Sequence, residues 1–382
     1  MAGWVLVKVA LLSDCYLPRL GGIEVQVHDL AHHLTRAGHT VEVFTATGDP
    51  AQPRSTHPTA DDVGMRVHRF DLGLPGGIPI NPLAVPEIRR RLGGGGFDVA
   101  HVHMGVVSPF AVDMARVALG LHIPTAVTWH CVLDGSATIH RTLGYAGRWA
   151  ERGAALSAVS AMAADRVRAI LPAGRGEVRV LGNGIDVSTW ARPADRPETE
   201  PFRITAIQRL VRRKRPDALI DVLLRTRELV PSSVELSVTI VGDGPQRAAI
   251  RQATSEHPWI SVPGRLTRPA LRELHWDAHA FVSMARLEAF GIAALEARTA
   301  GLPIVGLAGT GMDDFVHDGV EGLLATDDED VARALARLAT DPDLRTRIRD
   351  HNRTTPPEQA WPDIVEATLA EYHRAIEQGR RS

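Results

Sequence analysis

The fold is indicated most clearly by residues 280–306, which read AFVSMARLEAFGIAALEARTAGLPIVG. A short apolar run at 280–283 is followed by a stretch with helical spacing and then by a second apolar run at 302–306. Two strand-like runs separated by a helix are typical of a βαβ unit, in which the two strands are parallel. We therefore expect this segment to contribute to a parallel α/β sheet.

The same alternation of short β-rich runs and longer helical stretches extends through the rest of the chain. Further strand candidates are residues 5–12, 41–46, 99–103, 125–129, 156–159, 203–208 and 236–241. Residues 24–37 are predicted as a helix, because Gly38 follows at the position of a left-handed C-terminal cap. The whole pattern predicts an α/β protein built on parallel sheets.

Residues 191–201, ARPADRPETEP, interrupt this alternation. They are rich in proline and charge and poor in large apolar side chains, as interdomain linkers are. A chain of 382 residues is long enough for two domains. We predict one domain over residues 1–195 and a second over 196–360, with a cleft between them. A final helix at about 363–378 is predicted to pack back on the first domain.

Composition excludes several classes of protein. Hydrophobic residues make up 44% of the chain and charged residues 23%, which favours a folded protein with ample core. The net charge of -2 gives no general electrostatic case for binding nucleic acid. Cys15 and Cys131 are interpreted as reduced thiols. The N-terminus lacks the basic region of a signal peptide, and no apolar window is long enough to span a membrane, so we expect a cytoplasmic protein.

Two carboxylates, Glu288 and Glu296, flank Gly291 in the segment that indicates the fold. Eight residues within one helix would turn them about 80° apart, so they would not share a face. We therefore place Glu288 in a loop and begin a helix near Phe290 or Gly291. Free amides at that helix start can receive an anion or sugar hydroxyls, and the carboxylates can accept hydrogen bonds from hydroxyls. An exposed helix with ordinary surface glutamates is the alternative.

This segment resembles the Glu-x7-Glu signature of family 4 retaining glycosyltransferases, whose GT-B fold has two Rossmann-like domains facing a central cleft. Other segments are similar to the family's motifs, in the same order: residues 18–24, 101–103, 129–130, 182–186, 209–214, 241–245 and 301–305. The resemblance covers essentially the whole chain. It implies transfer of a hexosyl group, with retention, from a UDP- or GDP-sugar to a hydroxyl of a glycan, glycolipid or small molecule. The first domain would bind the acceptor and the second the donor.

The resemblance also implies roles for individual residues. The implied catalytic residues are Glu288, His130, Arg209 and Lys214. The implied donor-binding residues are Gly21, Gly22, Arg209, Lys214, Arg265, Glu288, Ala289, Phe290, Gly291, Ile292 and Glu296. Arg209 and Lys214 would bind the pyrophosphate, and such cations stabilise the charge of a departing nucleotide. His130 would lie beside the transferred sugar.

Several interpretations stay open at this point. The neighbouring Arg212, Arg213 and Arg215 could belong to a solvated basic turn. No metal ion or other cofactor is expected, because the sequence shows no cluster with ligand spacing. His101 and His103 are interpreted as pointing to opposite faces of their strand, with His101 in the core. A non-catalytic nucleotide-sugar-binding protein of the same fold is the alternative function.

Two further features concern the surroundings of the site. The loop at residues 309–314, GTGMDD, lacks the proline and glutamate of the corresponding family motif, which leaves its details in doubt. The basic residues 89–91 suggest a peripheral contact with the inner face of a membrane, and a solvated helix end is the alternative.

Overall fold

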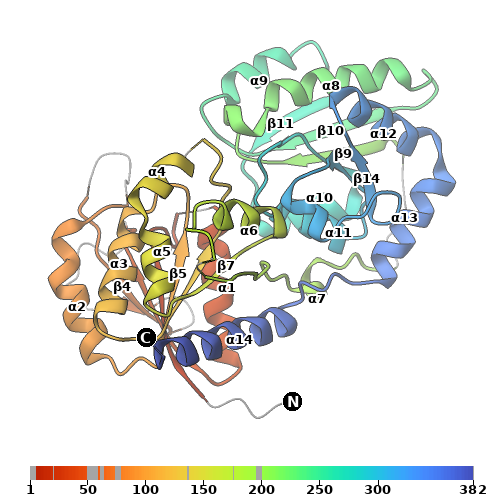
Figure 1. The fold of residues 1–382 in the computed structure, drawn as a ribbon. Coiled ribbons are helices and arrows are strands. Elements are labelled where there is room, and N and C mark those ends of the chain that lie inside the picture. The colour runs from red at the N-terminus through yellow and green to blue at the C-terminus, as the bar shows by residue number, and fades with distance from the viewer. Residues whose placement is uncertain are drawn as a thin grey trace. The chain divides into compact units, whose positions relative to one another are not determined.

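The computed structural model describes residues 6–19, 21–49, 59–60, 64–73, 79–135, 137–174, 176–194 and 200–381. The chain forms two compact units. Unit 1 comprises Met1–Gly184 and Trp361–Ser382, and unit 2 comprises Ile185–Ala360. Each unit is a Rossmann-like α/β structure built on its own sheet (Figure 1). The predicted α/β fold class with two Rossmann-like domains is confirmed.

The sheet of unit 1 has the strand order β3-β4-β2-β1-β5-β6-β7-β8. Its strands are β1 (Lys8–Ser13), β2 (Thr40–Thr45), β3 (Thr59–Ala60), β4 (Arg66–Arg69), β5 (Val99–Met104), β6 (Thr125–Trp129), β7 (Ala155–Ala158) and β8 (Val178–Val180). All neighbouring strands run parallel except β3, which pairs antiparallel with β4 at the edge. The described strands include each one predicted for this part of the chain, with ends that coincide or differ by up to three residues.

Helices cover both faces of this sheet. They are α1 (Gly22–Arg36), η2 (Pro82–Ala84), α2 (Val85–Gly94), α3 (Pro109–Gly120), α4 (Ala137–Leu143), α5 (Tyr145–Glu151), α6 (Ala161–Arg168) and α14 (Trp361–Gly379). Successive residues of β1 enter two different apolar clusters, because side chains alternate along a strand. Ala10 and Leu12 pack toward α2 and α3, whereas Val9 and Leu11 pack toward α1 and α14.

The sheet of unit 2 has the order β11-β10-β9-β12-β13-β14 and is parallel throughout. Its strands are β9 (Phe202–Ile207), β10 (Leu236–Val241), β11 (Ile260–Gly264), β12 (Ala280–Ser283), β13 (Ile304–Leu307) and β14 (Gly322–Ala325). Its helices are α7 (Val187–Trp190), η3 (Arg212–Lys214), α8 (Pro216–Leu229), α9 (Arg247–Ala253), α10 (Arg268–Asp277), α11 (Ile292–Thr299), η4 (Gly311–Asp314), α12 (Asp328–Thr340) and α13 (Pro342–Thr354). The βαβ unit predicted at residues 280–306 is formed by β12, α11 and β13.

The chain enters unit 2 after Gly184, earlier than the boundary predicted at residues 195/196. The reason is that the segment before the proline-rich stretch already bonds to unit 2. The amide of Ile185 donates to the carbonyl of Gln359 at 2.9 Å, and Nε1 of Trp276 donates to the carbonyl of Trp190 at 2.9 Å. Part of the predicted linker, 195–199, lies outside the described residues.

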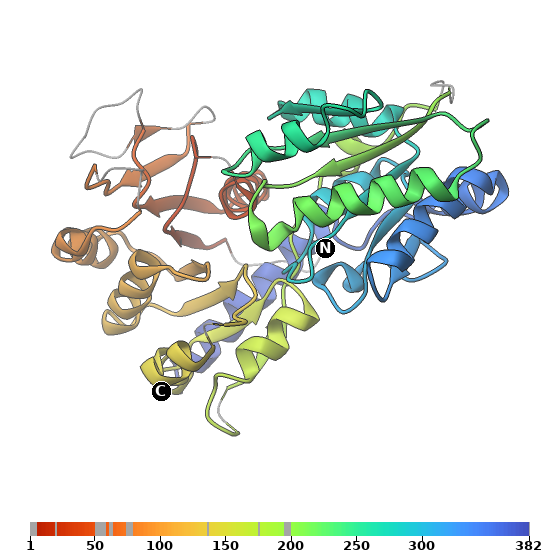
Figure 2. The same ribbon diagram turned by 90° about the horizontal axis from the view of Figure 1, so that it is seen from above.

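The last helix, α14, belongs to unit 1 although it follows unit 2 in sequence. In Figures 1 and 2 this dark blue helix lies along the strands of the N-terminal unit. Its buried residues Trp361, Leu369 and Tyr372 join the apolar cluster that also contains Val27 and Leu34 of α1. Across the described parts of the chain, we find no helix with the length and apolar character that crossing a membrane requires.

Candidate active site

The carboxyl ends of the strands in unit 2 bring several predicted residues to one edge of the sheet. In open α/β sheets, ligands bind at this edge where the strand order reverses. Here the reversal lies between β9 and β12, because the chain adds β10 and β11 on one side and β13 and β14 on the other. Lys214 follows β9 and Glu288 follows β12. Their side chains form an ion pair between Nζ and Oε2, with only 15% and 17% of their surfaces exposed.

The loop after β12 has the geometry that the sequence predicts. Helix α11 begins at Ile292, and Gly291 precedes it with a φ of 97°. A residue with a side chain rarely adopts this backbone conformation. Glu288 therefore lies in the loop, and the first amides of α11 have no partner within the helix. Phe290 is buried against Phe315, so it can offer a ligand only its backbone. Glu296, further along α11, is buried.

The atypical loop after β13 supports the Glu288 segment. The amide of Gly311 donates to the carbonyl of Glu288 at 2.8 Å. A Cβ atom on Gly311 would lie 2.1 Å from the carbonyl oxygen of Ala289, so the two backbones approach too closely for any side chain. A capping box between Thr310 and Asp313 closes the η4 turn. The loop thus contacts the segment without the proline and glutamate of the family motif.

Arg209 is presented by a close contact between two backbone segments. A Cβ atom on Gly242 would lie 1.8 Å from the carbonyl oxygen of Gln208, and one on Gly244 would lie 2.4 Å from that of Leu210. Only glycine allows the turn after β10 to pack so closely beside the turn after β9. Arg209 lies between these contacts with an exposed side chain. Among the described residues, its guanidinium forms no ion pair.

The other basic residues near this edge differ in their surroundings. Arg265 follows β11, is 65% exposed, and has Nε 3.6 Å from Oδ2 of Asp243. Arg215 instead donates two hydrogen bonds to Asp328, at 2.9 and 2.6 Å, which joins the start of α8 to the start of α12. Arg215 therefore has a structural partner, whereas Arg212 and Arg213 are exposed.

In unit 1, the predicted glycine loop leads directly into α1. Gly21 is the N-cap, with extended backbone, and α1 begins at Gly22. A Cβ atom on Gly21 would lie 2.4 Å from Oε2 of Glu24, whose carboxylate also pairs with Arg19 at 3.2 Å. The Glu24 carboxylate thus lies at the start of this helix. A side chain at position 21 would therefore displace the end of the Glu24 side chain.

His130 follows β6 in unit 1 and is partly exposed. Its amide donates to the carbonyl of Met104, and its Nε2 lies 2.9 Å from Nδ1 of His103. Burial lowers the pKa of His130 to about 4, although hydrogen bonding with Asn183 opposes this effect. The imidazole is therefore neutral near pH 7.

His101 and His103 lie on the same face of β5, and our interpretation of opposite faces was wrong. Residues two apart on a strand share a face, because the side-chain period is two. Their rings lie against each other with centroids 4.1 Å apart and planes tilted by 36°. Burial lowers the pKa of His101 to about 3 and that of His103 well below its usual value.

A small pocket lies beside these rings within unit 1. It is lined by Gln26, Leu30, His101, His103, Thr128, His130, Leu181, Gly182, Asn183, Trp361, Ile364 and Thr368. Nε2 of His103 is buried there and has no hydrogen-bond partner among the described residues.

One buried acidic residue, Asp14, was missed by the sequence analysis. It follows β1 at the reversal point of the first sheet, between β1 and β5. Its Oδ1 accepts hydrogen bonds from the amides of Phe110 and Ala111, at 3.0 and 3.4 Å, at the start of α3. Burial raises the pKa of Asp14 to about 6. Its place directly after a buried strand and before a glycine loop was the available signal.

Comparison with known proteins agrees with this arrangement. Residues 20–189 match the model of Glycosyltransferase Family 4, and residues 188–355 match that of Glycosyl transferases group 1. Glycogen synthase of Mycobacterium tuberculosis is 27% identical over 98% of this chain and 96% of its own. The GDP-mannose-dependent alpha-mannosyltransferase of the same species is 26% identical over 98% of both chains.

A solved structure shows the same fold at lower sequence identity. The crystal structure of Anabaena HepE in complex with UDP and glucose superposes with a TM-score of 0.71 at 19% identity, covering 95% of this chain and 98% of that one. The two family models together match residues 20–355, most of the chain. The protein is therefore a glycosyltransferase of family 4, with the GT-B fold.

Proposed function

We propose that the protein transfers a hexosyl group from a UDP- or GDP-sugar to a hydroxyl of a glycan, a glycolipid or a small molecule, with retention at the anomeric carbon. The observation that carries this proposal is the Lys214–Glu288 ion pair at the reversal point of the second sheet. The names of the relatives support the donor class, since one is dependent on GDP-mannose and the HepE complex contains UDP and glucose.

In this proposal the donor binds along the carboxyl edge of unit 2. The exposed Arg209 and the Lys214 ammonium bind the pyrophosphate, while Glu288 accepts hydrogen bonds from sugar hydroxyls. The amides around Gly291 add donors at the start of α11. Glu296 binds the ribose, and Arg265, which follows the edge strand β11, contacts the base.

The mechanism that we propose proceeds on one face of the sugar. The bond between the anomeric carbon and the phosphate oxygen breaks, and Arg209 and Lys214 stabilise the negative charge on the departing nucleotide. The acceptor oxygen forms its bond on the same face, and its proton passes to the leaving phosphate. A double displacement would need a carboxylate nucleophile beneath the anomeric carbon.

His130 lies beside the transferred sugar in this proposal and positions it. A residue with a pKa of about 4 is a poor proton acceptor at neutral pH, so we assign no general-base role to the imidazole. We propose that Gly21 and Gly22 line the donor phosphates in unit 1. These assignments rest on the resemblance of the motifs.

We propose that turnover needs no metal ion, because two cationic side chains already compensate the pyrophosphate charge. The protein is also proposed to act in the cytoplasm. The peripheral membrane contact stays a prediction. Arg90 and Arg91 both pair with Glu87, so of these three arginines Arg89 alone has no ion pair among the described residues.

The first test is release of nucleotide from a panel of UDP-, GDP- and ADP-sugars, with and without EDTA and with candidate acceptors. Wild-type protein is compared with Glu288→Ala and with Arg213→Ala, an exposed change on the same basic turn as Lys214. Release from one donor that resists EDTA, is lost in Glu288→Ala and is kept in Arg213→Ala supports the proposal and names the donor.

Other outcomes contradict specific parts of the proposal. Loss of release in EDTA, restored by added divalent metal, would overturn the metal-free mechanism. Unchanged release by Glu288→Ala would mean that the donor binds elsewhere. The stereochemistry of the product, read from the anomeric proton coupling by NMR, decides retention.

A further inference from the structure

A tyrosine from the C-terminal helix reaches the histidines near His130. The hydroxyl of Tyr372, on α14, lies 3.0 Å from Nδ1 of His101 on β5. Both side chains are buried, and their rings meet edge to face with centroids 5.4 Å apart. The sequence separation of 271 residues makes this one of the contacts by which the end of the chain completes unit 1.

In the chain of hydrogen bonds from His101 through Thr128 to Ser157, the donor and acceptor of each bond can be assigned. Nε2 of His101 lies 2.7 Å from Oγ1 of Thr128, which lies 2.8 Å from Oγ of Ser157. Ser157 donates to the carbonyl of Val127, which can only accept. Thr128 must then donate to Ser157, and His101 must donate from Nε2 to Thr128. The neutral imidazole is left with an accepting Nδ1, to which Tyr372 donates.

His101 is therefore held at both nitrogens, by α14 on one side and by β6 on the other. A ring fixed in this way cannot rotate without breaking a buried hydrogen bond, which is unfavourable because the freed polar groups have no water to bond to. The ring of His103 lies against it at 4.1 Å, and Nδ1 of His103 is bonded to Nε2 of His130. The orientation of His130 thus depends on His103. The orientation of His103 depends in turn on the His101 ring, whose position Tyr372 helps to set.

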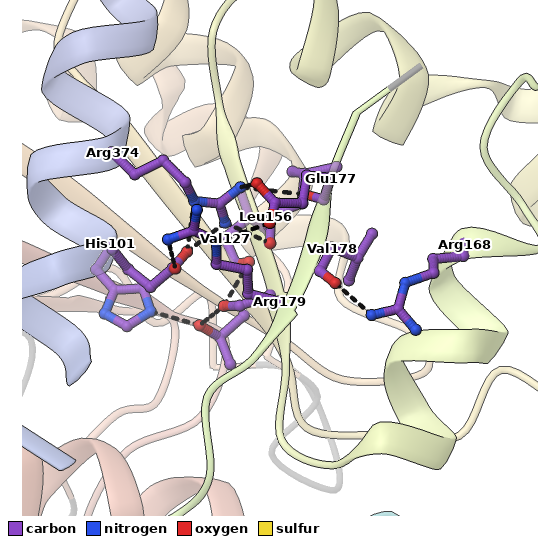
Figure 3. Close-up of polar contacts among 11 residues, drawn as sticks. His101, Val127, Leu156, Arg168, Glu177, Val178, Arg179 and Arg374 are labelled. Atoms are coloured by element: carbon purple, nitrogen blue, oxygen red, sulfur yellow. Dashed lines mark hydrogen bonds and ion pairs between the residues drawn. The ribbon is translucent and has the colours of Figure 1, made fainter. Parts of the chain in front are cut away.

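The segment that carries Tyr372 is itself fixed to the sheet. Arg374 donates from Nη2 to the carbonyl of Leu156 at 2.6 Å and from Nη1 to the carbonyl of Glu177 at 3.2 Å, and it pairs with Glu371 on the same helix. Figure 3 shows the Arg374 guanidinium reaching from α14 to Leu156 and Glu177, with His101 on the same side of the helix. Arg374 lies two residues from Tyr372, so its bonds to Leu156 in β7 and to Glu177 just before β8 hold the register of α14 at Tyr372.

We propose that Tyr372 is a positioning residue for His130, acting through His101 and His103. The proposal rests on the proposed function for its effect on turnover, because it assumes that His130 lies beside the transferred sugar. Tyr372 touches neither donor nor acceptor. Its contribution is to keep the imidazole of His130 in one orientation through the ring contacts of His101 with His103 and of His103 with His130.

Two substitutions remove the two anchors of His101 and change little else. Tyr372→Phe removes the hydroxyl and keeps the ring, and Thr128→Val removes the hydroxyl and keeps the shape. Tyr145→Phe is the matched control, because it breaks a Tyr–His hydrogen bond to His140 elsewhere in unit 1. Thr125→Val is the control on the same strand, where the threonine hydroxyl donates to the carbonyl of Ile123 and not to a histidine.

The kinetic expectation separates positioning from general destabilisation. With the donor found above, Tyr372→Phe and Thr128→Val should each lower kcat about tenfold, as expected for a displacement well below 1 Å, with KM for the donor changed less than about twofold. Both controls should retain wild-type kcat, although Tyr145→Phe should lose thermal stability to a similar degree as Tyr372→Phe. Equal kcat in Tyr372→Phe and wild type would overturn the proposal.

An NMR measurement decides the structural part without any turnover. In protein labelled with ¹⁵N-histidine, and assigned by single histidine substitutions, wild-type His101 should show the tautomer protonated at Nε2. In Tyr372→Phe, the Nδ1 signal of His101 should shift, and the signals of His103 and His130 should shift with it. Unchanged His103 and His130 signals would overturn the proposal even if an active donor is found. If no donor reacts, the proposed function fails while this measurement still decides the positioning.

Discussion

Lys214 forms an ion pair with Glu288 across the reversal point of the second sheet, although 74 positions separate the two residues in sequence. One residue follows β9 and the other follows β12, so the pairing depends on the fold. Each charge is compensated before any donor binds. A donor with a pyrophosphate and sugar hydroxyls offers a partner to each side chain, which allows the pair to separate without leaving either charge alone.

We expect Lys214→Met and Glu288→Gln each to lower kcat/KM by about 10²–10³-fold, the range found when one stabilising group of a reacting site is removed. The double variant should lose less than the product of the two effects, because each single change already removes the pair. Arg213→Met, on the same turn and exposed, should keep wild-type kcat/KM. Multiplicative losses in the double variant would show that the two residues act independently.

Gly311→Ala tests whether the atypical loop positions the Glu288 segment. The new methyl group would meet the carbonyl of Ala289 at 2.1 Å, so the two backbones must separate. We expect the free energy of unfolding to fall by about 1–3 kcal/mol, as at other overpacked sites. Turnover should also be lost at temperatures where the protein stays folded. Gly94→Ala, in α2, meets no atom within 4 Å and should change neither property. Full activity in Gly311→Ala would remove the loop from the site.

Much of the fold followed from the sequence because its signals are local. Residues 125–129 were predicted as a strand and form β6 with the same ends. A run of β-branched and aromatic residues that follows a proline indicates a strand without any knowledge of distant contacts. The start of α11 was placed within two residues, because two carboxylates eight residues apart around Gly291 would not share one face of a helix. The order of motifs then indicated the family.

The features that were missed depend on contacts distant in sequence. Nothing near Tyr372 shows that its hydroxyl meets His101, and nothing near Gly242 shows that it packs on the backbone of Gln208. The entry into unit 2 was placed too late, because a proline-rich stretch signals flexibility and not where bonding to the next unit begins. The interpretation of His101 and His103 failed for a simpler reason, since the period of a strand was misapplied.

Arg215→Ala should act on stability and leave donor binding unchanged. Its two hydrogen bonds to Asp328 are partly exposed, so screening by water limits their contribution to about 1 kcal/mol. The same pairing is the main cause that lowers the pKa of Asp328. The difference in unfolding free energy between wild type and Arg215→Ala should therefore be largest at neutral pH. It should vanish as the pH falls through the lowered pKa of Asp328, because the protonated carboxyl no longer pairs with Arg215. Urea unfolding at a series of pH values from 7 downward through 3.8 measures this, with Arg212→Ala as control. A raised KM for the donor in Arg215→Ala would assign it to the site.

Asp14 should make the protein less stable as the pH rises from about 4 to about 6. Its pKa is about 6 in the folded chain and 3.8 when unfolded, so in this window the folded state holds a proton that the unfolded state has released. Asp14→Asn removes this titration and keeps an oxygen that can accept from the amide of Phe110. The unfolding free energy of wild type relative to the variant should fall by about 2–3 kcal/mol between pH 4 and pH 7.

Urea unfolding of both proteins at four pH values across this window gives that difference directly. Other carboxylates cancel in it, including Glu42, whose pKa is lowered to about 2 and whose contribution is lost only on acidification below its unfolded value of 4.5. Asp113→Asn, a partly exposed change on α3, controls for replacing a carboxylate by an amide near the same helix. Curves for wild type and Asp14→Asn that stay parallel from pH 4 to pH 7 would mean that the Asp14 carboxyl is ionised throughout. In that case the amides at the start of α3 outweigh its burial.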